Sequence, residues 1–251
     1  MDLKRLSPAK VVNAPEAISK IKNGSRVFIG TGCGEPQHLI KAMVDDSDIQ
    51  DILVYQMLSS TLSDFIDLES FRRRFSLKLF FISSLMRKAA YEGKVDYIPA
   101  YLSEIPHLFN INQIGLDVAL VQISPPDRFG FGSLGVSVDV TKPAMLNADV
   151  VVAQVNPKMP CTWGDSFVHI DDIDFLVAYE EPLVESLLAA PDETVTERIG
   201  FYISELIDDG DTLQVGFGNL PYFILQHLEQ KKDLGIHTQM ITDAFKVLSH
   251  L

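Results

Sequence analysis

Two stretches near the end of the sequence carry the residues best suited to chemistry. The first is VGFGNLP, residues 215–221, where glycines follow an apolar run and Pro221 begins an expected helix. Glycines let the backbone approach a ligand closely, and free N–H groups at a helix start attract anions or a developing oxyanion. A tight turn between a strand and a helix explains the same pattern equally well, so both interpretations stand.

The second stretch is LGIHTQM, residues 234–240, which predicts a strand that delivers Gln239 to its end. A glutamine side chain offers both a hydrogen-bond donor and an acceptor. It is neutral, however, and its nitrogen lone pair is delocalised, so it is not a useful nucleophile toward a carbonyl group. The pattern therefore places a residue suited to binding where an α/β protein often places a catalytic one.

The segment GFGSLG, residues 130–135, matches the G-x-G-x-x-G pattern of dinucleotide-binding loops. That pattern indicates a dinucleotide only when a strand leads directly into it and a helix leaves from it. Here PPDRF separates it from the preceding apolar run, and Pro143 follows soon after. A mobile surface loop and a glycine loop lining an acyl pocket are the alternatives.

The irregular segment 156–174 contains His169 between Asp165 and Asp171, but neither spacing is that of a metal site. We interpret His169 as a hydrogen-bonded structural residue.

Apolar runs separated by helix-length segments predict the elements that must position these residues. The runs are mostly apolar rather than strictly alternating, as expected for parallel strands covered on both faces. We therefore predict an α/β fold with an open, mostly parallel sheet and helices on both faces, over residues 1–185. The expected strands are 25–30, 52–57, 77–83, 116–124, 148–155 and 174–179.

A change in residue composition near residue 185 predicts a second domain, 186–251. A helix from about Asp192 to Ile207 precedes two expected strands, 212–217 and 235–241. We expect this to be the truncated beginning of a second, similar α/β domain. Its incomplete sheet would leave an unpaired edge, which favours a homo-oligomer.

The formal net charge of −13 disfavours binding to nucleic acid. Cys33 and Cys161 are far apart and form no CxxC pair, which is compatible with a reducing compartment. No charged-then-apolar leader and no apolar run of membrane-spanning length is evident, so we expect a cytoplasmic protein that does not bind membranes.

Taken in order and spacing, several motifs resemble the acetyl-CoA hydrolase/transferase group of family I CoA-transferases. The resemblance covers nearly the whole chain, although family members are longer and have two α/β domains. The motifs that carry it are GTGCGEP (30–36), SPPDRFGFGSLGVSVDVTKPA (124–144), VNPKMPCTWGDSFVHIDDIDFLV (155–177), LQVGFGNLP (213–221) and KKDLGIHTQMITDAF (231–245).

The resemblance implies transfer of CoA from an acyl-CoA to a short carboxylic acid, of the 4-hydroxybutyrate or acetate type. It implies no metal and no organic cofactor, since the CoA thioester is a substrate. Gln239 stands where the family has its nucleophilic glutamate, so the chain as written would be catalytically impaired. The residues that match the family's CoA-binding loop are Gly216, Phe217, Gly218, Asn219 and Leu220.

Three functional interpretations remain open from the sequence. The first is an impaired CoA-transferase chain, and the second is a non-catalytic acyl-CoA-binding or assembly subunit. The third and weakest is a dinucleotide-binding oxidoreductase, which rests only on GFGSLG.

Overall fold

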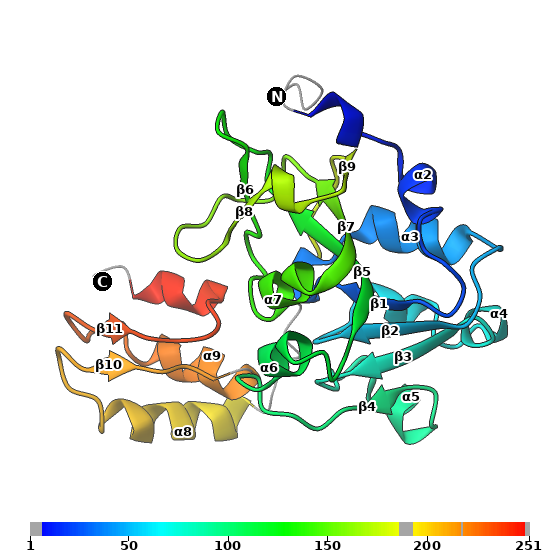
Figure 1. Cartoon of the computed structure of the whole chain (residues 1–251). Coiled ribbons are helices and arrows are strands. Elements are labelled where there is room, and N and C mark those ends of the chain that lie inside the picture. Colours follow the sequence, from blue (N-terminus) through cyan, green and yellow to red (C-terminus); the bar gives the residue numbers. More distant parts are fainter. Residues whose placement is uncertain (1–6, 186–192, 217, 249–251) are drawn as a thin grey trace. The chain divides into compact units, whose positions relative to one another are not determined.

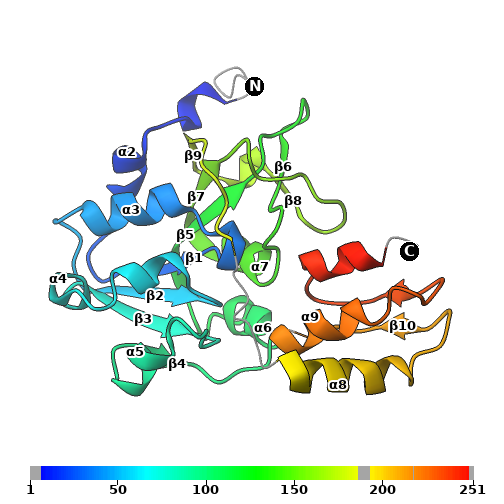
Figure 2. The ribbon, with the colours of Figure 1, turned by 180° about the vertical axis from the view of Figure 1, so that it is seen from behind.

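The computed structural model describes residues 7–185, 193–216 and 218–248. The chain divides into two compact units, Met1–Glu185 and Ser186–Leu251, each with its own hydrophobic core. Figures 1 and 2 show the chain from opposite sides, and each unit is described by itself.

Seven parallel strands form one sheet in the first unit, in the order β4-β3-β2-β1-β5-β7-β9. In the register of the sheet, Val27 of β1 lies opposite Val54 on one side and Val118 on the other. The predicted parallel sheet is confirmed. Its strands are β1 (Arg26–Ile29), β2 (Ile52–Gln56), β3 (Phe75–Leu79), β4 (Asp96–Tyr97), β5 (Leu116–Ile123), β7 (Ala148–Val155) and β9 (Phe175–Ala178).

Helices cover both faces of this sheet (Figures 1 and 2). Val27 and Ile29 face the core formed with α2, α3, α4 and α5, whereas Phe28 faces the core formed with α6 and α7. Both faces of β1 are therefore buried, which explains its uninterrupted apolar sequence. The α-helices are α2 (Ala14–Ile18), α3 (Gln37–Asp45), α4 (Glu69–Arg72), α5 (Arg87–Tyr91), α6 (Ile105–Asn110) and α7 (Thr141–Leu146). The 3₁₀ helices are η1 (Pro8–Lys10), η2 (Gly32–Gly34), η3 (Thr61–Asp64) and η4 (Ile170–Asp172).

The segment GFGSLG does not have the geometry of a dinucleotide-binding loop. Its residues Phe131–Ser133 form β6, which pairs antiparallel with β8 (Phe167–His169). The next helix, α7, begins only at Thr141. The segment is thus a paired strand rather than a strand-to-helix turn or a free surface loop.

The second unit contains α8 (Glu193–Ser204), β10 (Thr212–Leu213), α9 (Asn219–Gln226), β11 (Gly235–Ile236) and η5 (Asp243–Val247). β10 and β11 are parallel neighbours, but both are shorter than the predicted strands 212–217 and 235–241. The backbone turns toward α9 at Gly218, whose φ of +126° favours glycine. The predicted helix is also shorter, because Leu206 and Ile207 bond the third residue back instead of the fourth.

Candidate functional site

The order of the sheet reverses at β1, because the chain runs outward to β4 and then resumes at β5 on the other side of β1. Open parallel sheets bind their ligands outside the carboxyl ends of the strands at such a point. Here the turn after β1 begins at Gly30, whose N–H donates to Leu120 O of β5 at 2.8 Å. This edge is the candidate site of the first unit.

Buried amide side chains and two glutamates connect the ends of neighbouring strands at this edge, and we call these residues the strand-end network. Gln122 Nε2 donates to the backbone oxygen of Glu35 at 3.0 Å. Gln122 Oε1 accepts from Asn156 Nδ2 at 2.8 Å and from Gln154 Nε2 at 3.2 Å. Gln154 and Asn156 reach further to the side chain and backbone of Glu181, respectively. The network consists of Glu35, Gln56, Gln122, Gln154, Asn156 and Glu181.

Glu35 supplies the buried charge of this network. Its carboxylate accepts hydrogen bonds from Ser60 N at 2.6 Å, Thr61 N at 2.7 Å and Gln56 Nε2 at 3.0 Å. Desolvation by burial raises the pKa of this carboxyl, and the hydrogen bonds from Thr61, Ser60 and Gln56 oppose that rise only in part.

The segment after β6 borders the same edge. Gly34 N donates to Ser137 Oγ at 3.1 Å, and Thr31 Oγ1 donates to Asp139 Oδ2. Asp139 has a φ of +20°, and its Oδ1 accepts from the N–H of Thr141, the first residue of α7, at 3.0 Å. A cleft of about 420 Å³ adjoins Asp139. It is lined by Val138, Asp139, Lys142, Pro143, Leu146, Trp163, Asp165 and Ser166.

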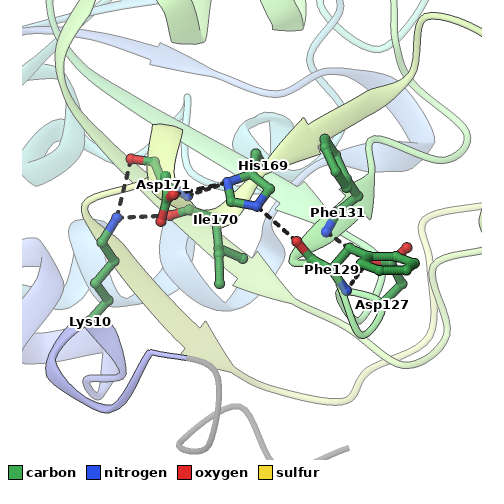
Figure 3. Close-up of polar contacts among 7 residues, drawn as sticks. All are labelled: Lys10, Asp127, Phe129, Phe131, His169, Ile170 and Asp171. Atoms are coloured by element: carbon green, nitrogen blue, oxygen red, sulfur yellow. Dashed lines mark hydrogen bonds and ion pairs between the residues drawn. The ribbon is translucent and has the colours of Figure 1, made fainter.

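His169 has the structural role expected from its sequence context (Figure 3). Its Nδ1 accepts from Asp171 N at 3.2 Å, so a neutral ring carries its proton on Nε2. Nε2 then donates to Phe129 O at 2.9 Å. Asp127 Oδ1 accepts from Phe129 N and Phe131 N and completes the turn before β6. Within the described ranges, no group of three or more His, Cys, Asp or Glu residues is arranged to hold a metal ion.

In the second unit, the structure brings Gln239 and the predicted glycine loop to one edge. Gly216 follows β10, and the exposed Gln239 follows β11, its parallel neighbour. Thr238 Oγ1 donates to Val215 O at 2.6 Å, which joins the two segments one residue from each of these positions. Gly218 precedes α9, which begins with Asn219 and Leu220, whereas Phe217 lies outside the described residues.

Sequence reasoning missed the strand-end network, although the sequence contained a signal for it. Gln56, Gln122 and Gln154 each interrupt an otherwise apolar run close to its end. A polar side chain at a buried strand position must find a partner, so repeated amides at strand ends indicate a network.

No helix in the part of the chain that the structure describes is long and apolar enough to cross a membrane.

Comparison with known proteins gives one family. The family model described as the acetyl-CoA hydrolase/transferase N-terminal domain matches residues 4–187. The chain is 40% identical to 4-hydroxybutyrate coenzyme A transferase of Clostridium kluyveri, covering 97% of this chain and 56% of that protein. It is 39% identical to the succinyl-CoA:acetate/propanoyl-CoA:succinate CoA transferase of Fasciola hepatica, covering 97% of this chain and 51% of that protein.

Solved structures agree with these relatives. RipA from Yersinia pestis superposes with a TM-score of 0.87 at 30% identity, over 99% of this chain and 60% of that chain. A 4-hydroxybutyrate CoA-transferase from Porphyromonas gingivalis gives a TM-score of 0.77 at 33% identity, over 99% of this chain and 58% of that chain. The chain therefore spans about half the length of the curated relatives it matches. From this match and the fold described above, the chain belongs to the acetyl-CoA hydrolase/transferase family.

Proposed function

We propose that the protein represented by this chain is a CoA-transferase, which moves CoA between an acyl-CoA and a short carboxylic acid. The observation that supports this most is the Thr238–Val215 hydrogen bond, because it brings Gln239 beside the glycine loop. A nucleophile at position 239 would then act next to backbone N–H groups able to stabilise an oxyanion. The names of the relatives support acids such as 4-hydroxybutyrate, acetate and succinate as substrates.

The proposed reaction needs a glutamate carboxylate at position 239. The carboxylate attacks the thioester carbonyl, the C–S bond breaks, and a mixed anhydride and CoA thiolate form. The thiolate then attacks the glutamyl carbonyl of the anhydride, releases the donor acid and leaves a glutamyl-CoA thioester. An acceptor carboxylate repeats these steps in reverse order, which returns the glutamate and gives the new acyl-CoA. Every bond exchange is balanced without a metal or an organic cofactor.

Gln239 favours a second candidate function for the chain as written. An amide has nearly the volume of glutamate but cannot form the anhydride, so we propose that this chain is catalytically impaired. A non-catalytic acyl-CoA-binding or assembly subunit is the alternative that this residue supports. Both candidates use the loop of Gly216, Phe217, Gly218, Asn219 and Leu220 to bind CoA.

A Gln239→Glu variant tests the proposal in a chain of the relatives' length. We expect ping-pong transfer between acetyl-CoA and 4-hydroxybutyrate, with a gain that can reach about 10⁶, the cost of removing a covalent nucleophile. Borohydride reduction after acetyl-CoA treatment should label position 239 in peptide mass spectrometry. Gln226→Glu adds the same charge to the exposed end of α9 and serves as the matched control. Binding of acetyl-CoA by Gln239→Glu without label or transfer would leave the subunit function as the better one.

We further propose that the protein is a homo-oligomer. Within the described residues, β10 and β11 form a sheet of two strands, so each strand has one edge open to another chain. Light scattering that shows only monomer at high concentration would contradict this.

A further inference from the structure

Glu35 is a buried charge that the proposed reaction does not use. Glu35 is 0% exposed and lies at the end of the turn after β1. The polar partners of its carboxylate are the backbone N–H groups of Ser60 and Thr61, the side-chain amide of Gln56 and the Thr61 side chain. Among the residues that the structure describes, no Lys, Arg or His side chain forms an ion pair with it.

The environment of Glu35 is unfavourable for stability alone. Burial of an unpaired carboxylate is costly, and here desolvation outweighs the hydrogen bonds in its effect on the pKa of the group. A neutral side chain of the same size would be cheaper to bury. Residues that break a rule of stability without an evident gain are typical of functional sites.

The geometry shows what the carboxylate achieves. It accepts from two successive backbone N–H groups, those of Ser60 and Thr61, and so fixes the loop that follows β2. Gln56 donates both to this carboxylate and to Gly30 O, each at 3.0 Å, while Gln122 of β5 donates to the backbone of Glu35. Glu35 therefore connects the carboxyl ends of β1, β2 and β5 where the order of the sheet reverses.

Glutamine could not reproduce these contacts, because it offers one acceptor oxygen and one NH₂ group. Whichever way the amide turns, its NH₂ group faces the N–H of Ser60 or of Thr61, since these donate to different carboxylate oxygens. The loop would then have to move away from the turn formed by Gly32–Gly34.

We infer that Glu35 is a positioning residue: its carboxylate holds the Leu58–Thr61 loop against the Gly32–Gly34 turn in the arrangement that acyl transfer requires. This inference rests on the proposed function. Glu35 acts through the backbone of the two loops and does not itself react.

Amide hydrogen exchange of the 251-residue chain tests the positioning directly. In Glu35→Gln, exchange at residues 57–64 should become roughly 10–100-fold faster, as for loss of a hydrogen bond to a charged group. The melting temperature should be maintained or raised. Glu35→Asp keeps the charge on a shorter side chain and should give an intermediate rate. Glu16→Gln, on the exposed face of α2, is the control and should change neither property.

Kinetics in a chain of the relatives' length that also carries Gln239→Glu test the consequence for catalysis. Adding Glu35→Gln should lower kcat about 10–100-fold, as expected for a displacement of about 1 Å, with KM for acetyl-CoA nearly unchanged. Unchanged exchange at 57–64, kcat within twofold of the parent, or a fall in melting temperature with faster exchange throughout would overturn the inference.

The two proposals fail in different ways. If the Gln239→Glu parent shows no transfer, the proposed function fails, and exchange at 57–64 alone decides whether Glu35 positions the loop. If Glu35→Gln does not fold, the same two measurements on Glu35→Asp decide the matter, with intermediate losses supporting the inference and wild-type values overturning it.

Discussion

Gly135, at the end of the GFGSLG segment, offers a strict test of how tightly this segment packs. It has a φ of +64°, and a Cβ atom there would lie 2.6 Å from Met159 Cγ and 2.8 Å from Pro160 O, and closer still to Met159 Sδ. Gly93, just after α5, has a similar φ of +69°, but a Cβ atom there would meet nothing within 4 Å. The two Gly→Ala substitutions therefore share backbone strain and differ in steric conflict.

The expected magnitude follows from this comparison. In each variant, an alanine held in the left-handed backbone region destabilises the folded state by roughly 1–2 kcal/mol. Each variant is also stabilised by the same small amount, because alanine reduces the conformational entropy of the unfolded chain. These contributions cancel in the difference between the variants. The conflict at Gly135 remains, since the methionine side chain can move but the Pro160 carbonyl belongs to the backbone. Overpacking of this kind costs typically 1–3 kcal/mol.

Thermal and urea unfolding of both variants measure this difference. Both positions belong to the first unit, so they report on the same transition. At about 2–4 °C per kcal/mol for a domain of this size, Gly135→Ala should melt roughly 2–12 °C below Gly93→Ala. Equal stability of the two variants within about 0.5 kcal/mol, with equal urea m values, would refute the reasoning. It would show that residues 159 and 160 move aside without a cost in stability.

Three further substitutions have expected outcomes. Asn13→Ala removes the acceptor of Glu16 N at the start of α2, and should lower the unfolding free energy by about 1 kcal/mol in urea titrations. Desolvation raises the pKa of Asp117, but hydrogen bonds from the backbone and side chain of Arg26, together with the nearby positive charges, outweigh this effect and lower the pKa. Asp117→Asn should therefore lower the free energy of unfolding by about 1 kcal/mol, a value already reduced because the ion pair is partly exposed. Burial raises the pKa of Glu35 above its unfolded value of 4.5, so its contribution to stability is present below pH 4.5 and lost as the pH rises through the folded pKa. Unfolding free energies measured from pH 4 to 7 should thus fall less steeply in Glu35→Gln than in the wild type, and parallel curves would contradict this.

The sheet of the first unit was predictable because its strands are buried on both faces. The run at 116–124 became β5, Leu116–Ile123, and the run at 148–155 became β7 with its predicted bounds. β4 was missed because Asp96 and Tyr97 are both exposed and form no apolar run. The pairing of β6 with β8 was missed because it joins segments more than thirty residues apart, through contacts that local periodicity does not report.

The candidate sites were predictable to different degrees. The sequence predicted that Gln239 lies at the end of one strand and that the glycine loop follows another, and the parallel pairing of β10 with β11, which brings these positions to one edge, became evident only from the structure. Glu35 was not predicted, because a charged residue between glycine and proline is most often a solvated turn residue. Its burial depends on Ser60 and Thr61, which approach it only when β1 and β2 pair.

The strand-end network has a consequence for how this sheet can change over evolution. Gln122 donates to one neighbour and accepts from two others, so no single substitution there keeps all three contacts. Residues in one hydrogen-bond network show strongly non-additive mutational effects. Sequence change at Gln122 should therefore be accompanied by changes at its three partners, and a library that varies Gln122 alone should yield variants that lose at least one of these contacts. Substitutions at the exposed ends of the same strands should remain independent of one another.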